Sequence, residues 1–330
     1  MAKISTQELF DEFFAEAADP YMIRNKNSVV RPEVFEFEKK IGKQFVDMNE
    51  EELIEMILTF KSKGGFPVGY TTYDPISTIY RRIFDYYSQH HCPIYNPWNS
   101  KAMKGANVYE RLLEGTTPLT WSFVEKMIDD LYKHNAPDRA KYIECLIRMY
   151  HCGFKDPGEV VRLKECMINF RDKTVRLEGY TVQLDDVCAR LLVEVHNMER
   201  MSGWRGDFLM STWRDGYFKY PIRPARAADF DSRSFEEVVG TLSRVFGERV
   251  RIDLGCDINH GRLFYLGVYE KVVSLFGKER AIEIITSTRD SQAVIDLQNV
   301  ARSYGLESSK MKQLRRMLRM YIPRDVVTGD

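Results

Sequence analysis

The chain has 330 residues, of which 44% are hydrophobic and 29% are charged, and its formal net charge is zero. These values are typical of an ordinary globular protein with one large or two medium cores. No run of about 18 apolar residues occurs, and the N-terminus lacks the apolar core of a signal peptide, so we expect a cytoplasmic protein with no membrane partner.

The neutral balance conceals an uneven distribution of charge. Residues 1–60 hold 13 acidic and 7 basic residues, whereas segments 200–226 and 308–330 each hold six basic and two acidic residues. Local basic patches of this kind bind phosphate. The sequence therefore permits a nucleic-acid partner in spite of its zero net charge.

The six cysteines lack the CxxC spacing of a zinc site and do not suggest a disulfide framework. His90 and His91 stand beside Cys92, but adjacent residues on a helix diverge by about 100° and rarely bind one ion together. We therefore expect reduced thiols, no metal and no cofactor.

The N-terminal third of the chain predicts a helical domain. Ser5 with Glu8, and Asn49 with Glu52, match the capping box, in which side chains satisfy the free backbone groups at the start of a helix. We expect one helix to begin after Ser5 and another after Asn49.

The clearest helix of the sequence lies farther along. Asp74 and Pro75 suit its N-cap and its first helical position, and apolar residues recur at helical spacing from residue 76 to residue 87. The other face carries Arg81 and Arg82. We expect the helix to begin at Pro75 and to present both arginines to solvent.

Two segments that break helices follow. CPIYNPWNSKAMKG (92–105) contains two prolines, and GTTPLT (115–120) is typical of a linker. We therefore predict two domains, residues 1–117 and 118–330.

The second domain predicts both helices and strands. Ser234 with Glu237 forms a third capping box, and Gly247 suits the end of the same helix. Around them the patterns predict helices at 121–134 and 139–150, strands at 167–170, 174–177 and 180–184, and further helices to the C-terminus. This order indicates the mainly α (α+β) class with a small antiparallel sheet.

The order of these elements resembles the tyrosine recombinases, the phage integrase family. In that family an asparagine-proline segment and an LT-x-x-x-(V/I) helix precede a TGLR-x-x-E-(L/V)-x-x-L box and a small sheet. Here the corresponding stretches read NPWNSKAMKG, LTWSFV, CGFKDPGEVVRL with one extra residue, and KECMINF. The resemblance covers nearly the whole chain and implies a helical core-binding domain followed by a catalytic-type domain.

The resemblance also identifies what an active member would need: two arginines that grip a phosphate, a lysine, a histidine or tryptophan, and a nucleophilic tyrosine. The first arginine position holds Lys155, which keeps the charge but loses the planar fork of a guanidinium. The second box falls on INHGRLFYL, where Arg262 keeps the arginine position while Asn259 and Leu263 replace the histidines.

The remaining catalytic positions are lost as well. The lysine position falls in the shortened turn LEGYT, no histidine or tryptophan follows His260, and the tyrosine position falls in AVIDLQNV (293–300). Glu159 keeps the structural acidic position. The resemblance therefore implies a protein that is not an enzyme.

A protein that resembles the recombinases but lacks their catalytic groups can still present a surface that binds the phosphates of DNA. We therefore predict a sequence-specific, double-stranded DNA-binding transcriptional repressor. The chain resembles the recombinase-shaped master repressors of SPβ-like temperate phages, which implies prophage lysogeny and a place on the bacterial nucleoid. The basic residues predicted to contact DNA are Lys155, Arg262, Arg81, Arg82, Lys101, Lys104, Arg205 and Arg214.

Other interpretations of these residues stay open. Lys155 suits a solvated loop, Arg262 suits an internal ion pair with an acid such as Glu159, and Trp213 and Phe208 suit a core. The apolar stripe of KMKQLRRMLRMY (310–321) suits docking on the body of the chain or on a second copy, which would give self-association.

Two other functions also stay open. One is an active recombinase in which Tyr304 or Tyr321 attacks DNA. The other is a pseudo-enzyme that binds only proteins.

Overall fold

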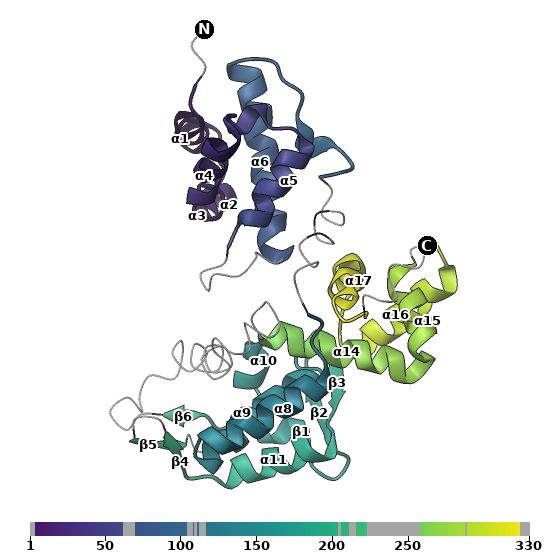
Figure 1. Cartoon of the computed structure of the whole chain (residues 1–330). Helices are drawn as coiled ribbons and strands as arrows, with labels where there is room; N and C mark the ends of the chain where they lie inside the picture. The colour runs from purple at the N-terminus through teal and green to yellow at the C-terminus, as the bar shows by residue number, and fades with distance from the viewer. Residues whose placement is uncertain are drawn as a thin grey trace. The chain divides into compact units, whose positions relative to one another are not determined.

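The computed structural model describes residues 4–61, 70–103, 108, 111, 117–203, 206–210, 216–222, 258–287 and 289–323. The chain divides into two compact units, Met1–Thr116 and Thr117–Asp330, drawn in Figure 1. The described residues are mainly helical, with small antiparallel sheets in the second unit. The predicted fold class is thus confirmed.

The first unit is helical and has an aromatic core. Its elements are α1 (Thr6–Glu16), α2 (Pro20–Arg24), α3 (Lys26–Val29), α4 (Pro32–Ile41), the 3-10 helix η1 (Phe45–Asp47), α5 (Glu50–Thr59), α6 (Tyr70–His90) and the 3-10 helix η2 (Pro97–Asn99). The Phe45 ring lies 5.5 Å from the Phe10 ring and 4.8 Å from the Tyr80 ring. All three rings are fully buried, and burial of each such side chain contributes about 1.5–3 kcal/mol.

Both predicted capping boxes of this unit are confirmed. The backbone N–H of Glu8 donates to Ser5 Oγ at 3.3 Å, and the backbone N–H of Ser5 donates to the Glu8 carboxylate at 2.9 Å. Asn49 and Glu52 exchange the same two bonds, at 3.0 and 2.9 Å. Helices α1 and α5 therefore begin where the sequence predicts.

The predicted start of α6 is wrong. The helix begins at Tyr70, so that Asp74 and Pro75 lie inside it and not at its N-cap and first position. The cause lies in the tertiary structure: Tyr73 is fully buried, and its hydroxyl donates to the Met103 carbonyl at 2.8 Å. These contacts hold the turn ahead of the proline in the helix and offset the proline's cost of about 3 kcal/mol.

The asparagine-proline segment after α6 is bound back onto that helix. Asn96 Nδ2 donates to the Arg81 carbonyl at 2.9 Å and to Asp85 Oδ1 at 2.7 Å. Asn96 Oδ1 accepts from the backbone N–H of Trp98 at 3.0 Å, and the Trp98 ring is buried. These bonds fix the backbone of the α6 turn that carries Arg81 and Arg82.

The described residues of the second unit form helices and two three-stranded antiparallel sheets. Its elements are α8 (Trp121–His134), α9 (Pro137–Cys152), α10 (Pro157–Val161), the 3-10 helix η3 (Glu165–Met167), β1 (Ile168–Asn169), β2 (Thr174–Leu177), β3 (Tyr180–Gln183), α11 (Asp186–Asn197), β4 (Arg200–Gly203), β5 (Gly206–Met210), β6 (Pro221–Ile222), α14 (His260–Phe276), α15 (Lys278–Thr286), α16 (Ser291–Ser303), the 3-10 helix η6 (Ser308–Lys310) and α17 (Met311–Arg319).

The three predicted strands are confirmed as β1, β2 and β3. Val175 of β2 lies opposite Ile168 of β1 and Val182 of β3, which gives one face of buried or half-buried aliphatic side chains. The sheet of β4, β5 and β6, in which Met201 lies opposite Phe208, was not predicted.

Helix α14 lies between two cores of the second unit. Leu263 and Leu266 belong to a core that includes α8, α9, α11 and the first sheet, whereas Phe264, Val268 and Val272 belong to a core with α15, α16 and α17. In Figure 1, α15, α16 and α17 gather on one side of α14. Helix α14 therefore contributes side chains to both cores.

The crossing of α9 and α14 is very close. A Cβ atom built on Gly267 of α14 would lie 1.8 Å from the carbonyl oxygen of His151 in α9, a separation that no side chain permits. The His151 ring stacks on Trp121 with centroids 4.0 Å apart, and its Nε2 lies 2.9 Å from Glu270 Oε2. These contacts of His151 hold α9 so close to α14 that only a glycine fits at position 267.

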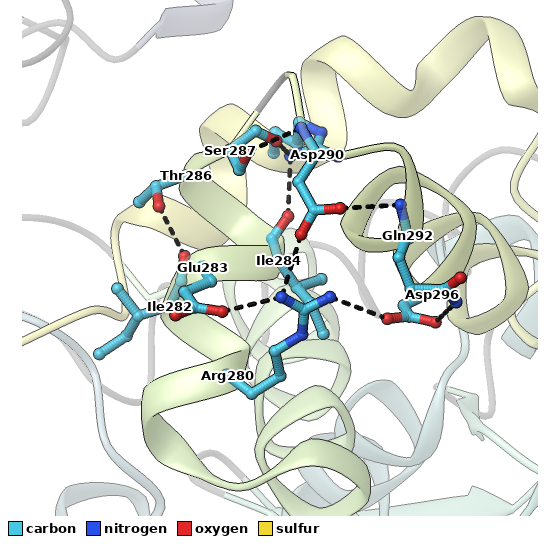
Figure 2. A network of polar contacts seen from close by, with 10 residues as sticks. Arg280, Ile282, Glu283, Ile284, Thr286, Ser287, Asp290, Gln292 and Asp296 are labelled. Carbon is cyan, nitrogen blue, oxygen red and sulfur yellow. Dashed lines mark hydrogen bonds and ion pairs between the residues drawn. The ribbon is translucent and has the colours of Figure 1, made fainter.

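Polar contacts join α15 to α16 (Figure 2). Arg280 Nη1 donates to Glu283 at 2.8 Å and to Asp290 at 3.0 Å, and its Nη2 lies 3.5 Å from Asp296. Asp290 is also the N-cap of α16, because it accepts from the backbone N–H of Gln292 at 2.9 Å. One guanidinium therefore gathers three carboxylates and fixes the angle between the two helices.

Helix α17 docks on the body of the same chain. Leu314 and Leu318 of its apolar stripe are buried in the core of α14, α15 and α16. Arg315 of the same helix is also buried, and it donates to the carbonyls of Ile284 and Ser287 at the end of α15. The arginine thereby satisfies acceptors that the end of a helix leaves free.

Several predictions lie outside the described residues. These are the capping box of Ser234 and Glu237, the helix end at Gly247, and the burial of the Trp213 and Phe208 side chains.

No helix in the part of the chain that the structure describes is long and apolar enough to cross a membrane. Among the same residues, no group of three or more histidine, cysteine or acidic side chains could hold a metal ion. Within the described ranges the free cysteines are Cys92, Cys145, Cys152, Cys166 and Cys188.

Candidate nucleic-acid interface

The structure describes five of the eight basic residues that were predicted to contact DNA. Lys155 and Arg262 belong to the second unit, and Arg81, Arg82 and Lys101 belong to the first. Lys104, Arg205 and Arg214 lie outside the described residues.

The turn between α9 and α10 carries Lys155. Gly153 ends α9 with φ at 132°, a value that side chains rarely adopt, and Asp156 begins α10 by accepting from the backbone N–H of Glu159 at 3.0 Å. A Cβ atom on Gly153 would also lie 2.9 Å from the Tyr304 ring. Glycine is therefore required here both for the backbone and for space.

The ammonium of Lys155 is occupied within the chain. Its Nζ lies 3.5 Å from Glu159 Oε1 and 4.2 Å from the centre of the Tyr180 ring, and it donates to the Gly305 carbonyl at 3.4 Å. The side chain is 26% exposed. The interpretation of Lys155 as a solvated loop residue is therefore wrong, and Glu159 balances its charge.

Glu159 organises this box structurally. Its Oε2 accepts from the backbone N–H of Lys155 at 2.6 Å and from the Tyr180 hydroxyl at 2.9 Å. The Gly153 carbonyl oxygen lies 3.2 Å from the same hydroxyl oxygen. Burial, and then the neighbouring Glu159 carboxylate, raise the pKa of Tyr180. The phenol therefore stays protonated and ties β3 to the turn.

Arg262 lies in the first turn of α14. Asn259, where the recombinases have a histidine, is the N-cap of this helix and accepts from the backbone N–H of Arg262 at 3.0 Å. The Arg262 carbonyl accepts from the Tyr321 hydroxyl at 2.6 Å, and its side chain is half-buried. Leu263, at the other histidine position, is fully buried in the core.

His260 precedes Arg262 by two residues. Its ring lies 5.7 Å from the Tyr150 ring, and burial lowers the pKa of His260, with the Asp156 carboxylate acting in the opposite direction. A lowered pKa leaves the imidazole neutral near pH 7. Arg262 is therefore the charged group of this helix start.

Two further segments near the positions that the resemblance singled out have contacts within the chain. Ala293, Leu297 and Val300 of α16, in the segment where the tyrosine would lie, are buried. Lys173 precedes β2 and pairs with Asp186 at 2.7 Å, at the start of α11.

The two later tyrosines both bond to carbonyls of α14. The Tyr304 hydroxyl donates to Gly267 at 3.4 Å, and the Tyr321 hydroxyl donates to Arg262 at 2.6 Å. Burial raises the pKa of Tyr304, and Tyr321 is 4% exposed. A buried phenol whose hydroxyl donates a hydrogen bond to a carbonyl is a poor nucleophile, because attack needs the phenolate.

In the first unit the basic residues lie on the surface. Arg81 and Arg82 are exposed on α6, and Arg82 Nη1 lies 3.6 Å from Asp19, with both side chains about half exposed. Lys101 is exposed just after η2. As predicted, the face of α6 that carries both arginines is turned to solvent.

The sequence did not indicate that Tyr180, Gly305 and Tyr321 belong to this site. Gly305 lies 150 residues from Lys155, and Tyr321 lies 59 residues from Arg262. A Cβ atom on Gly305 would lie 2.5 Å from the Tyr180 ring. The one local signal was this glycine after a helix, whose φ of 62° suits a helix end.

No protein-family model matches the sequence, and no curated protein is similar to it. The solved structures similar to this chain include the Tn1549 transposon integrase in complex with a circular intermediate DNA, with a TM-score of 0.40 and 10% identity over 94% of this chain and 98% of that one. A λ integrase dimer bound to a COC′ core site has a TM-score of 0.39 and 12% identity over 89% and 95% of the two chains. XerA recombinase has a TM-score of 0.34 and 13% identity over 96% and 97%.

Proposed function

We propose that this protein is a sequence-specific DNA-binding repressor of a temperate phage, built on a tyrosine recombinase scaffold that has lost its catalytic groups. The observation that carries the proposal is the contrast between Arg262 and its neighbours. Arg262 keeps a charged guanidinium at the start of α14, while Asn259 caps the helix and Leu263 fills the core. Arg262 could thus still hold a phosphate. Asn259 and Leu263, at the positions of the histidines that would transfer protons, instead support the fold.

The internal contacts of the box support binding without catalysis. Transfer of a DNA strand needs a phosphate gripped by two guanidinium groups and a tyrosine free to attack it. Lys155 supplies one ammonium whose charge Glu159 balances. Tyr304 and Tyr321 are held inside the chain by α14. Self-association through the C-terminal helix stays a prediction.

Removing the Arg262 side chain tests the phosphate contact. A guanidinium can make two charge-assisted hydrogen bonds to one phosphate, each worth about 1.5–3 kcal/mol. We expect Arg262→Ala to weaken binding to a duplex selected from a random pool by about tenfold or more. The dependence of log affinity on log salt should become shallower by about one unit, with unchanged sequence preference.

The control for this variant is Arg190→Ala, which removes an exposed positive charge that pairs with Glu194 on α11 at 3.7 Å. It changes the net charge equally and should leave affinity within about twofold. An Arg262→Ala protein that melts early, yet binds through its folded fraction with the salt slope of the wild type, would mean that Arg262 serves only the fold.

The absence of catalysis is tested with suicide DNA substrates, which trap a covalent intermediate. We expect no protein–DNA adduct after incubation between about pH 6 and pH 9, because the Tyr304 and Tyr321 hydroxyls donate to α14 carbonyls. Denaturing gels with labelled DNA measure the result. A phosphotyrosyl bond at either residue would show that the protein is an active recombinase. If the protein retards no duplex in a gel at low salt, the alternative of a pseudo-enzyme that binds only proteins would be favoured.

A further inference from the structure

The backbone of Arg262 is held from two sides by side chains. Its N–H donates to Asn259 Oδ1 at 3.0 Å, and its carbonyl accepts from the Tyr321 hydroxyl at 2.6 Å. The first turn of a helix has N–H groups without partners inside the helix and frays most easily. The Asn259 bond satisfies one of these N–H groups, and the Tyr321 bond adds a side-chain contact to a carbonyl of the same turn.

Tyr321 is itself firmly placed. It follows α17, whose Leu318 is fully buried, and only 4% of Tyr321 is exposed. Its ring stacks on Tyr269 of α14, with centroids 5.9 Å apart and planes 28° from parallel. The hydroxyl thus reaches the Arg262 carbonyl from a ring that has little freedom to move.

A second tyrosine provides a natural comparison. The Tyr304 hydroxyl also donates to a carbonyl of α14, but at Gly267, beyond the first turn, and at 3.4 Å. The two hydroxyls therefore have the same chemistry on the same helix. They differ in whether their bond reaches the turn that carries the arginine.

We propose that Tyr321 is a positioning residue for Arg262. Its hydroxyl holds the first turn of α14 so that the guanidinium meets a DNA phosphate in one orientation, as the geometry of a bidentate contact requires. Tyr321 does not touch DNA in this proposal and acts only through the Arg262 backbone. The inference rests on the proposed function, because it assumes that Arg262 binds phosphate.

Tyr321→Phe removes the hydroxyl and keeps the buried ring. With a labelled duplex selected by the full chain from a random pool, we expect the affinity to fall about three- to tenfold, as the loss of one well-made hydrogen bond allows. The salt dependence should become shallower, in the same direction as for Arg262→Ala. Tyr304→Phe, the matched control, should bind within about twofold of the wild type.

A double-mutant cycle separates positioning from ordinary stability. If Tyr321 acts through Arg262, Tyr321→Phe should cause no further loss of affinity in a chain that already carries Arg262→Ala. Binding is measured well below the melting transitions, so that a loss of stability alone leaves the affinity unchanged. Additive losses, or a Tyr321→Phe protein that binds like the wild type, would overturn the inference.

The failure of this inference can be told apart from the failure of the proposed function. If Arg262→Ala itself binds DNA like the wild type, the phosphate contact is wrong and Tyr321 has nothing to position. If Arg262→Ala weakens binding while Tyr321→Phe does not, the proposed function stands and only the role of Tyr321 falls.

Discussion

Gly267→Ala should destabilise the second unit by about 3 kcal/mol or more and lower its melting temperature by about 10 °C. A methyl group at this position would lie 1.8 Å from the His151 carbonyl oxygen, and this oxygen belongs to the backbone of a packed helix. The only relief is to move α9 and α14 apart, which loosens the core that both helices share. Calorimetry or denaturant unfolding measures the effect.

The control is Gly261→Ala, a substitution in the first turn of the same helix. There the nearest heavy atom to a new Cβ is Asn259 Oδ1 at 3.3 Å, so a small adjustment of one side chain is enough. We expect a change within about 1 kcal/mol, since alanine also favours the helix over glycine. Equal stability of Gly267→Ala and the wild type would show that the two helices can separate without cost.

Separating the two units should reduce DNA affinity by more than about a hundredfold. Each unit has a core of its own, so the fragments 1–116 and 117–330 are expected to fold alone. In the whole chain, once one unit has bound the duplex, the linker holds the other unit near it at a millimolar effective concentration. Cleavage between the units removes this advantage. Titration of each fragment, and of their mixture, against the selected duplex measures the loss.

A chain with about ten glycine and serine residues inserted after Thr116 is the control, because lengthening a flexible linker reduces effective concentration only gradually. It should keep most of the affinity of the intact protein. If either fragment alone binds the duplex as tightly as the whole chain, the two units do not act together on DNA.

The elements that could be predicted from sequence are those set by local patterns. The capping boxes of α1 and α5 and the strands β1, β2 and β3 depend on neighbours only a few residues apart, and all are confirmed. The start of α6 depends on Tyr73 reaching Met103, 30 residues away, and this contact moved the helix start ahead of Pro75. Tertiary packing there outweighed a correct reading of local propensity.

The candidate site divides in the same way. The resemblance to recombinases singled out Lys155 and Arg262, and the structure places them in the turn after α9 and in the first turn of α14. It could not indicate that Lys155 is paired with Glu159 beneath Gly305, or that Tyr321 bonds to the Arg262 backbone. Those contacts depend on how the C-terminal segments that carry Gly305 and Tyr321 pack against Lys155 and Arg262.

The position of α14 between two cores limits how this helix can change during evolution. Of its seventeen residues, only Lys271, Ser274 and Leu275 are exposed, and all three lie in its last two turns. Most surface helices have a whole face on which substitutions accumulate freely, because that face contacts only water. This helix has no such face near Arg262. Relatives of this chain should therefore preserve the start of α14 whatever they bind, since two cores depend on it.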